Sequence, residues 1–248
     1  MSSLKNRIIK ILTLLGIIII ASIVGVLIGL AITGNIKRDY PVFSPEEKIN
    51  GIVVKDLVEK YKPIIYQPEN IKSRPEFIYY EVTELEDGFL ITYFIFWGDE
   101  YHPNSFVDKI YRVFREAYFS SKVDIETIEI LIDKNTLAIR KVAFETLHPE
   151  STPELPKHTA VILTLLENGS IQVTYDQTEE ILDFNPFNGS RIIVEVITWN
   201  HLLSLSKNPK GLVYNLELMF MDDDTYARYK MVRRSRILHK QNEPIAIT

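Results

Sequence analysis

Cysteine is absent from the 248 residues, and so are the linear motifs of the commonest catalytic sites. Without cysteine no disulfide can form, so the free energy of folding has to come from a packed core. The sequence has no nucleophile elbow, phosphate-binding loop, dinucleotide fingerprint or His-Glu-x-x-His zinc helix. Catalytic groups can still meet in space without a linear motif, so these absences disfavour an enzyme without excluding one.

Basic residues are scarce after the first 38 positions. Those positions hold five Lys and Arg and no acidic residue, which leaves 23 basic and 33 acidic residues and a formal charge of about −10 for the rest. An acidic domain of this kind disfavours nucleic acid or anionic lipid as the main partner. The 210 residues that remain are enough for one domain with a substantial core.

One long apolar run precedes this acidic part. Residues 11–32 carry no charge, and 17 of the 25 residues in 8–32 are Ile, Leu or Val. As a helix the run would be about 37 Å long, against roughly 30 Å of bilayer hydrocarbon. A cleaved signal peptide has a shorter apolar core and a small-x-small cleavage site. We therefore expect an uncleaved transmembrane helix over residues 8–33, which makes the lipid bilayer a partner.

The flanking charges set the expected orientation. The three basic residues before the run have no acidic neighbour, whereas Lys37 and Arg38 after it are followed closely by acidic residues. The positive-inside rule then places residues 1–7 in the cytoplasm, and the connector 34–50 and the domain 51–248 outside.

Small residues recur every four positions in the apolar run, at Ala21, Gly25 and Gly29. Such a stripe lies on one helix face and lets two helices approach closely, which favours a homo-oligomer or a membrane-protein partner. The alternative is that glycine is simply common in membrane helices.

Helical and strand periods alternate from residue 51 onward. Helices are predicted over residues 52–61 and 103–120 and from Asp222 to about Arg236. Strands are predicted over residues 76–85, 89–97, 124–133, 137–147, 158–166, 171–175, 191–199 and 212–221. The strand 89–97 is apolar on both faces, which is typical of a central strand covered on both sides. The pattern predicts an α+β fold, a mainly antiparallel β-sandwich-like domain with peripheral helices, after one N-terminal transmembrane helix.

The predicted helix over residues 103–120 has a continuous apolar stripe, with Arg112 and Arg115 nearby on the surface. The stripe consists of Phe106, Ile110, Val113, Phe114, Ala117 and Tyr118.

The most distinctive polar feature is the pair Asp124 and Glu126. Strand side chains alternate, so both carboxylates share a face with the isoleucines that follow in the same strand. If that is the core face, the acids need a partner, because buried carboxylates are costly alone. One candidate is a divalent cation, Ca²⁺, Mg²⁺ or Mn²⁺ rather than Zn²⁺, held also by Asp99, Glu100 and His102. The other is a structural ion pair with Arg112 or Arg115.

Three segments, residues 96–102, 124–130 and 142–148, together resemble a β-sandwich group. The group comprises the vacuolar-protein-sorting-associated sandwich proteins and, more remotely, the necrosis- and ethylene-inducing peptide-like toxins. The resemblance covers about residues 55–150. It implies that Asp124 and Glu126 match an Asp-Trp-Glu element that binds a divalent cation in the toxins, with Ile125 in place of the tryptophan, and that His148 matches a histidine ending the next strand.

This sequence departs from the toxins before that element. Ser120-Ser121-Lys122-Val123 stands where they have His-x-His, so the full ligand set is not present in the linear sequence.

Three further features have a functional and a structural interpretation. His201 alternates onto the face of Trp199 and could reach the Asp124 site, although a histidine at a strand end is often structural. Asn168 and Asn188 each begin an Asn-Gly-Ser sequence, which is a glycosylation acceptor in a secreted domain and equally a turn. The acidic run from Asp222 is explained by capping of a helix start.

Three functions follow as hypotheses. The first is a single-pass, membrane-anchored outer-surface domain with a binding or structural role and a possible divalent-cation site. The second is a membrane-tethered, metal-dependent hydrolase that uses Asp124, Glu126 and His148 around the cation. The third is an assembly component of a membrane complex, paired through Ala21, Gly25 and Gly29.

Overall fold

The computed structural model describes residues 40–119, 123–152, 155–176, 178–230 and 237–238. Residues 1–7, the predicted transmembrane helix 8–33 with its stripe of Ala21, Gly25 and Gly29, and the first part of the connector lie outside the described residues. Within the described ranges, no helix has the length and apolar character needed to cross a bilayer.

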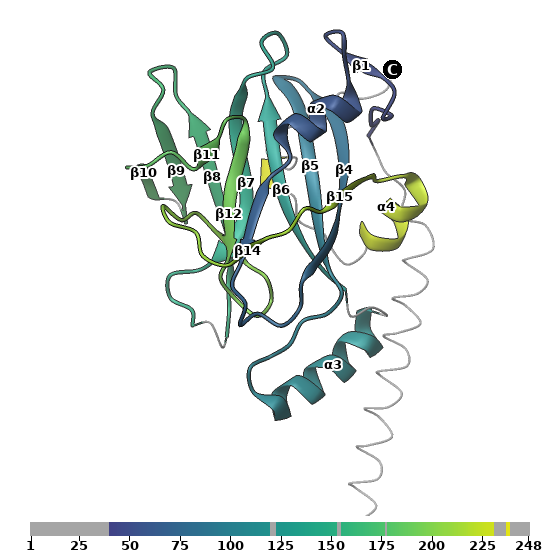
Figure 1. The fold of residues 1–248 in the computed structure, drawn as a ribbon, viewed down its shortest axis with the longest axis vertical. Helices are drawn as coiled ribbons and strands as arrows, with labels where there is room; N and C mark the ends of the chain where they lie inside the picture. Colours follow the sequence, from purple (N-terminus) through teal and green to yellow (C-terminus); the bar gives the residue numbers. More distant parts are fainter. Residues whose placement is uncertain (1–39, 120–122, 153–154, 177, 231–236, 239–248) are drawn as a thin grey trace, which may run out of the picture.

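The larger of two main sheets has eight strands (Figure 1). Its order is β10-β9-β8-β7-β6-β5-β4-β15. The strands are β4 (Pro75–Leu85), β5 (Gly88–Trp97), β6 (Asp124–Ile132), β7 (Ile139–Leu147), β8 (His158–Leu165), β9 (Ile171–Tyr175), β10 (Thr178–Ile181) and β15 (Glu217–Phe220). The predicted hairpin around residues 86–88 is confirmed, because β4 and β5 pair antiparallel along their whole length.

The smaller sheet has the order β11-β12-β3-β14, with β13 also paired to β12. Its strands are β3 (Ile64–Gln67), β11 (Phe187–Asn188), β12 (Arg191–Val196), β13 (Leu203–Ser204) and β14 (Leu212–Val213). A separate pair, β1 (Lys48–Ile49) and β2 (Ile52–Val53), precedes helix α2 (Val54–Tyr61).

The sheets are mainly antiparallel, as predicted, but they are mixed and contain two parallel pairs that the sequence pattern did not predict. Most neighbours are antiparallel, but β12 pairs parallel to β3 and β15 pairs parallel to β4. Parallel neighbours need a long crossover, and here the partners are separated by more than a hundred residues of chain. Periodicity within a strand carries no information about such distant pairing.

The core lies between the two sheets, and the central strands are buried on both faces. Every residue of β5 and β6 is buried, so the prediction of a doubly covered central strand is confirmed. Ile128 and Ile130 of β6 pack in one cluster with Ile65 of β3 and Val194 of β12. On the outer face, helix α4 (Asp223–Lys230) covers a second cluster with Phe94 and Phe96.

The predicted strand over residues 212–221 is wrong as one element. Leu212–Val213 forms β14 in the smaller sheet, and Glu217–Phe220 forms β15 in the larger sheet. The alternating pattern continues across the crossover, so the period alone could not locate the break.

Helix α3 (Ser105–Phe119) lies beyond one end of the strands, and its orientation corrects the sequence prediction (Figure 1). Arg115 is 5% exposed, whereas Phe106 is 71% exposed and Val113 68% exposed. The helix therefore contacts the body through its polar side. The reason lies in its position, because Asp99 and Glu100 at the end of β5 pair with Arg112 and Arg115 of the helix.

Candidate functional site

A buried polar cluster forms where β5 ends and β6 begins. Trp97 and Asp124 are register partners, so Asp99 and Glu100, which follow β5, lie beside the first residue of β6. Antiparallel pairing thus brings together acidic residues that are more than twenty positions apart in sequence. We call Asp99, Glu100, Asp124, Arg112, Arg115 and His201 the strand-end cluster.

Helix α3 supplies the cations of this cluster. Arg112 pairs with Asp99 at 2.7 Å, and Arg115 pairs with Glu100 in a contact where both side chains are about 6% exposed. Tyr111 of the same helix donates a hydrogen bond to Glu100 Oε2 at 2.6 Å. Arg115 also donates to the carbonyl oxygen of Val123 at 2.8 Å. Guanidinium groups are well suited to such buried pairing.

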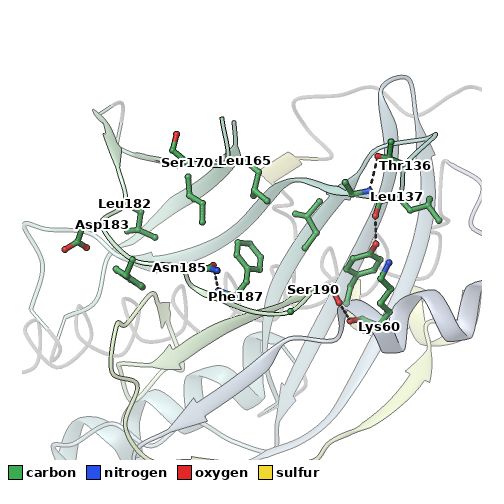
Figure 2. Close-up of a pocket in the computed structure, with 17 residues that line it drawn as sticks. Lys60, Thr136, Leu137, Leu165, Ser170, Leu182, Asp183, Asn185, Phe187 and Ser190 are labelled. Atoms are coloured by element: carbon green, nitrogen blue, oxygen red, sulfur yellow. Dashed lines mark hydrogen bonds between the residues drawn. The ribbon is translucent and has the colours of Figure 1, made fainter. Parts of the chain in front are cut away.

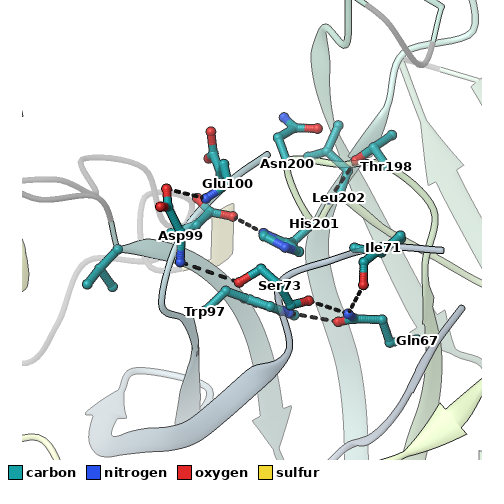
Figure 3. Close-up of polar contacts among 12 residues, drawn as sticks. Gln67, Ile71, Ser73, Trp97, Asp99, Glu100, Thr198, Asn200, His201 and Leu202 are labelled. Carbon is teal, nitrogen blue, oxygen red and sulfur yellow. Dashed lines mark hydrogen bonds and ion pairs between the residues drawn. The ribbon is translucent and has the colours of Figure 1, made fainter. Parts of the chain in front are cut away.

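His201 joins the cluster from the loop after β12 (Figure 3). Its side chain is fully buried, its Nδ1 lies 2.8 Å from Asp124 Oδ2, and its ring stacks on Trp97 with centroids 4.6 Å apart. The backbone at His201 has φ of +60°, an uncommon conformation for a non-glycine residue. Trp97 in turn donates from Nε1 to Gln67 Oε1 at 2.8 Å, which fixes the indole. No described residue gives His201 Nε2 a hydrogen-bond partner.

Burial shifts the proton affinities of two groups in opposite directions. The pKa of Glu100 is raised to about 7, because burial and the neighbouring Asp124 carboxylate outweigh the opposing effect of Arg115. The pKa of His201 is lowered to about 3, chiefly because burial disfavours the imidazolium. His201 is therefore neutral at physiological pH, and its contact with Asp124 is a hydrogen bond.

The other predicted site residues lie in three different surroundings. Glu126 is 1% exposed on the same strand face as Asp124. His102 has its ring against Trp199, at 4.8 Å between centroids. His148 lies 3.1 Å from Asp176, away from the cluster.

Across the described part of the chain, no three His, Asp or Glu side chains are arranged to hold a metal ion. Asp99 and Glu100, two of the predicted ligands, instead face guanidinium groups that would repel a cation. The cation stays a prediction.

Sequence reasoning missed several members of this region. Gln67 accepts a hydrogen bond from Trp97, and Ser73 accepts one from the backbone N–H of Asp99 (Figure 3). Tyr111 donates to Glu100, so the region draws on a strand, a loop, another strand and a helix. A large aromatic residue that ends a fully apolar strand, as Trp97 does, is the one available signal, and it indicates only a buried position.

A pocket of about 770 Å³ opens at the other end of the strands (Figure 2). Strand β6 begins at the strand-end cluster, and the turn after its other end contributes Thr136 and Leu137 to the pocket. The pocket combines aromatic and aliphatic side chains with hydroxyl, amide and charged groups. They include Tyr61, Leu165, Leu182, Phe184, Phe187, Lys60, Asp183, Asn185, Ser170 and Ser190.

Both Asn-Gly-Ser sequences lie at this pocket. Asn168 and Asn188 are exposed, and the Gly-Ser residues that follow each of them line the opening. Ser170 Oγ donates to Asn168 Oδ1 at 2.6 Å, and Ser190 Oγ donates to the carbonyl oxygen of Lys60 at 2.8 Å. Gly169 and Gly189 both have positive φ, so the turn interpretation is confirmed at both sites.

No protein-family model and no curated protein matches this chain. Among solved structures, NLPPya in complex with glucosamine has a TM-score of 0.42 at 10% identity, over 81% of this chain and 86% of that one. The non-toxic HaNLP3 protein has a TM-score of 0.42 at 12% identity, over 82% of this chain and 88% of that one.

A third solved structure is Necrosis and Ethylene inducing Protein 2 from the causal agent of cocoa's Witches Broom disease. It has a TM-score of 0.40 at 9% identity, over 80% of this chain and 83% of that one. The resemblance to the necrosis-inducing toxin-like group is thus a distant likeness of fold.

Proposed function

We propose that the chain is a membrane-anchored binding domain, held in the bilayer by residues 8–33 with residues 51–248 outside. One observation favours binding over catalysis. The buried acids Asp99, Glu100 and Asp124 already have arginine or histidine partners from the same chain. Buried charges that are paired within a fold hold its elements in place, whereas a catalytic metal centre keeps an open coordination position.

The pocket at the other end of the strands is the part that can accept a ligand. Its volume of about 770 Å³ falls within the range typical of small-molecule sites. Aromatic and aliphatic side chains can cover an apolar ligand face, while Asn185, Ser170 and Lys60 can hydrogen-bond to its polar groups. This mixture suits a small ligand with both kinds of surface.

The partners that follow from this proposal are the bilayer and the pocket ligand. The charge of about −10 on the outer domain disfavours nucleic acid. Pairing of two anchors through Ala21, Gly25 and Gly29 would give a homo-oligomer or a complex with another membrane protein. Crosslinking of the full-length chain with and without a bulky residue at Gly25 would detect such pairing.

The absence of cysteine makes the predicted topology directly testable. We expect Asn168→Cys in intact cells to react with a membrane-impermeant maleimide, because Asn168 is exposed on the outer domain. The matched variant Ser3→Cys should react only after permeabilisation, because residues 1–7 are predicted to be cytoplasmic. Both variants should stay with the membrane through alkaline carbonate washing. Loss of the protein in that wash, or labelling in the opposite order, would contradict the proposed anchor or its orientation.

Ligand binding in the pocket is testable with a pair of neighbouring substitutions. A fragment library screened by ligand-observed NMR on the full-length protein in nanodiscs is expected to give binders that Leu182→Arg abolishes, since Leu182 lines the pocket. Ile181→Arg is the control, because Ile181 is 59% exposed and does not line it. Binders that survive Leu182→Arg would place the binding site elsewhere.

A further inference from the structure

The floor of the 770 Å³ pocket is continuous with the core between the two sheets. Four of the apolar side chains that line the pocket also pack against the buried core cluster, namely Ile139, Leu165, Leu182 and Phe187. In Figure 2 three of them lie in the middle of the pocket, with Lys60 on one side and Asp183 on the other. A ligand that enters the pocket therefore meets an apolar floor with one charged residue at each side.

The two charged residues are not equally available to a ligand. Asp183 Oδ2 lies 3.7 Å from the ammonium group of Lys207. Within the described ranges Lys60 Nζ has no carboxylate oxygen within 4.0 Å, and the neighbouring Glu59 pairs at 3.6 Å with Lys62 instead. The charge that the pocket leaves unpaired is therefore positive.

The hydroxyl groups at the pocket add no further donors. Four hydroxyl side chains line it, and each already donates its proton to an oxygen of the protein: Tyr61, Thr136, Ser170 and Ser190. Asn185 keeps its amide NH₂ group for a ligand, because its Oδ1 accepts from the backbone N–H of Phe187 at 3.0 Å. Figure 2 shows Asn185 nearer to Asp183 than to Lys60, so Lys60 is the donor at its own side of the pocket.

We propose that the pocket ligand is an organic carboxylate with an apolar body. The carboxylate accepts a charge-assisted hydrogen bond from Lys60 Nζ. The apolar body lies on Leu165, Leu182 and Phe187. This inference rests on the proposed function, which places ligand binding in this pocket.

The negative charge of the domain does not oppose such binding strongly. The formal charge of about −10 is distributed over the whole domain. At physiological ionic strength the interaction between exposed charges is screened over about 8 Å. A carboxylate in contact with Lys60 therefore interacts mainly with that ammonium group.

Probes of matched size and different charge test the proposal. We choose naphthylacetate, its neutral amide naphthylacetamide, and the cation naphthylethylamine. Their affinities are measured by ligand-observed NMR on the full-length protein in nanodiscs, with empty nanodiscs as the reference. We expect the carboxylate to bind about fivefold to tenfold more tightly than the amide, the usual gain from one charged hydrogen bond at a partly open site.

Variants of Lys60 assign the preference to this residue. Lys60→Met is expected to abolish the difference between carboxylate and amide, and Lys60→Arg is expected to retain it. Lys55→Met is the matched control and should change nothing, because Lys55 is exposed on the same helix and does not line the pocket. Unchanged thermal unfolding shows that each variant keeps the fold.

Two results would overturn the proposal. Wild type that binds the amide or the amine as tightly as the carboxylate has no preference for an anion. A preference that survives Lys60→Met places the anion elsewhere.

The fragment screen separates this failure from failure of the proposed function. If neutral or cationic fragments bind, Leu182→Arg abolishes their binding and carboxylates do not bind, the pocket is a ligand site and only the carboxylate assignment is wrong. If no binder of any charge responds to Leu182→Arg, the proposed ligand pocket is wrong as well.

Discussion

Arg115→Ala is expected to lower the free energy of unfolding by about 3 to 5 kcal/mol, the usual cost of removing one partner of a buried ion pair. Arg115 is 5% exposed and pairs with Glu100, which is also 5% exposed. Without the guanidinium, Glu100 keeps its desolvation penalty and its repulsion from Asp124. Tyr111 and Arg112 would still connect α3 to Glu100 and Asp99. The lost stability therefore comes from the strand-end cluster and not from unfolding of the helix. Thermal and denaturant unfolding of the full-length protein at pH 8, where Glu100 is ionised, would measure the change.

The matched control is Arg140→Ala. Arg140 pairs with Asp87 at 3.4 Å, and the two side chains are 43% and 35% exposed. Exposed pairs of this kind contribute about 1 kcal/mol or less. If Arg115→Ala cost no more than Arg140→Ala, the cluster would not have the structural role assigned to it.

A double substitution separates the pair from its surroundings. Glu100→Gln combined with Arg115→Ala should cost less than the sum of the two single changes, because the double variant no longer buries an unpaired carboxylate.

The sequence allowed good prediction of the elements whose signals are local. The hairpin of β4 and β5 follows from two apolar runs around a tight turn, and the burial of β5 follows from its apolar residues on both faces. The position of Asp124 and Glu126 on the core face follows from strand alternation, and both are buried. Each of these inferences needs only residues within one strand or one turn.

Features that depend on distant pairing could not be predicted in this way. The parallel partners of β3 and β4 come from late in the chain, and the pocket draws on several separate segments. The α3 stripe was identified correctly as an apolar stripe, but its direction was wrong. Periodicity shows that a helix has two faces, and it cannot show which of the two packs against the protein.

The pH dependence of stability is the second large effect, and it begins with Glu100. Its pKa is 4.5 in the unfolded chain and about 7 in the folded one. Between these values the folded state holds one proton more than the unfolded state, so stability falls as pH rises. Over the whole window the loss is about 3 kcal/mol, and it is complete above pH 7.

His201 acts in the opposite direction at lower pH. Its pKa is 6.5 in the unfolded chain and about 3 in the folded one. Between these values the unfolded state holds the extra proton, so stability rises as pH rises. From pH 4.5 to 6.5 the contributions of His201 and Glu100 have similar slopes of opposite sign, and they nearly cancel.

Glu100→Gln separates the two contributions, because the amide keeps the size and hydrogen bonds of the carboxyl group without its titration. Unfolding of wild type and variant should be followed from pH 4 to 8 in the same detergent. We expect the stability of Glu100→Gln relative to wild type to increase by about 3 kcal/mol between pH 4.5 and 7, since only the wild type loses its proton there. Taking the difference removes the contribution of every other group that titrates alike in both proteins. A difference that stays constant with pH would show that Glu100 is already ionised in the fold, and Arg115 would then outweigh burial at this site.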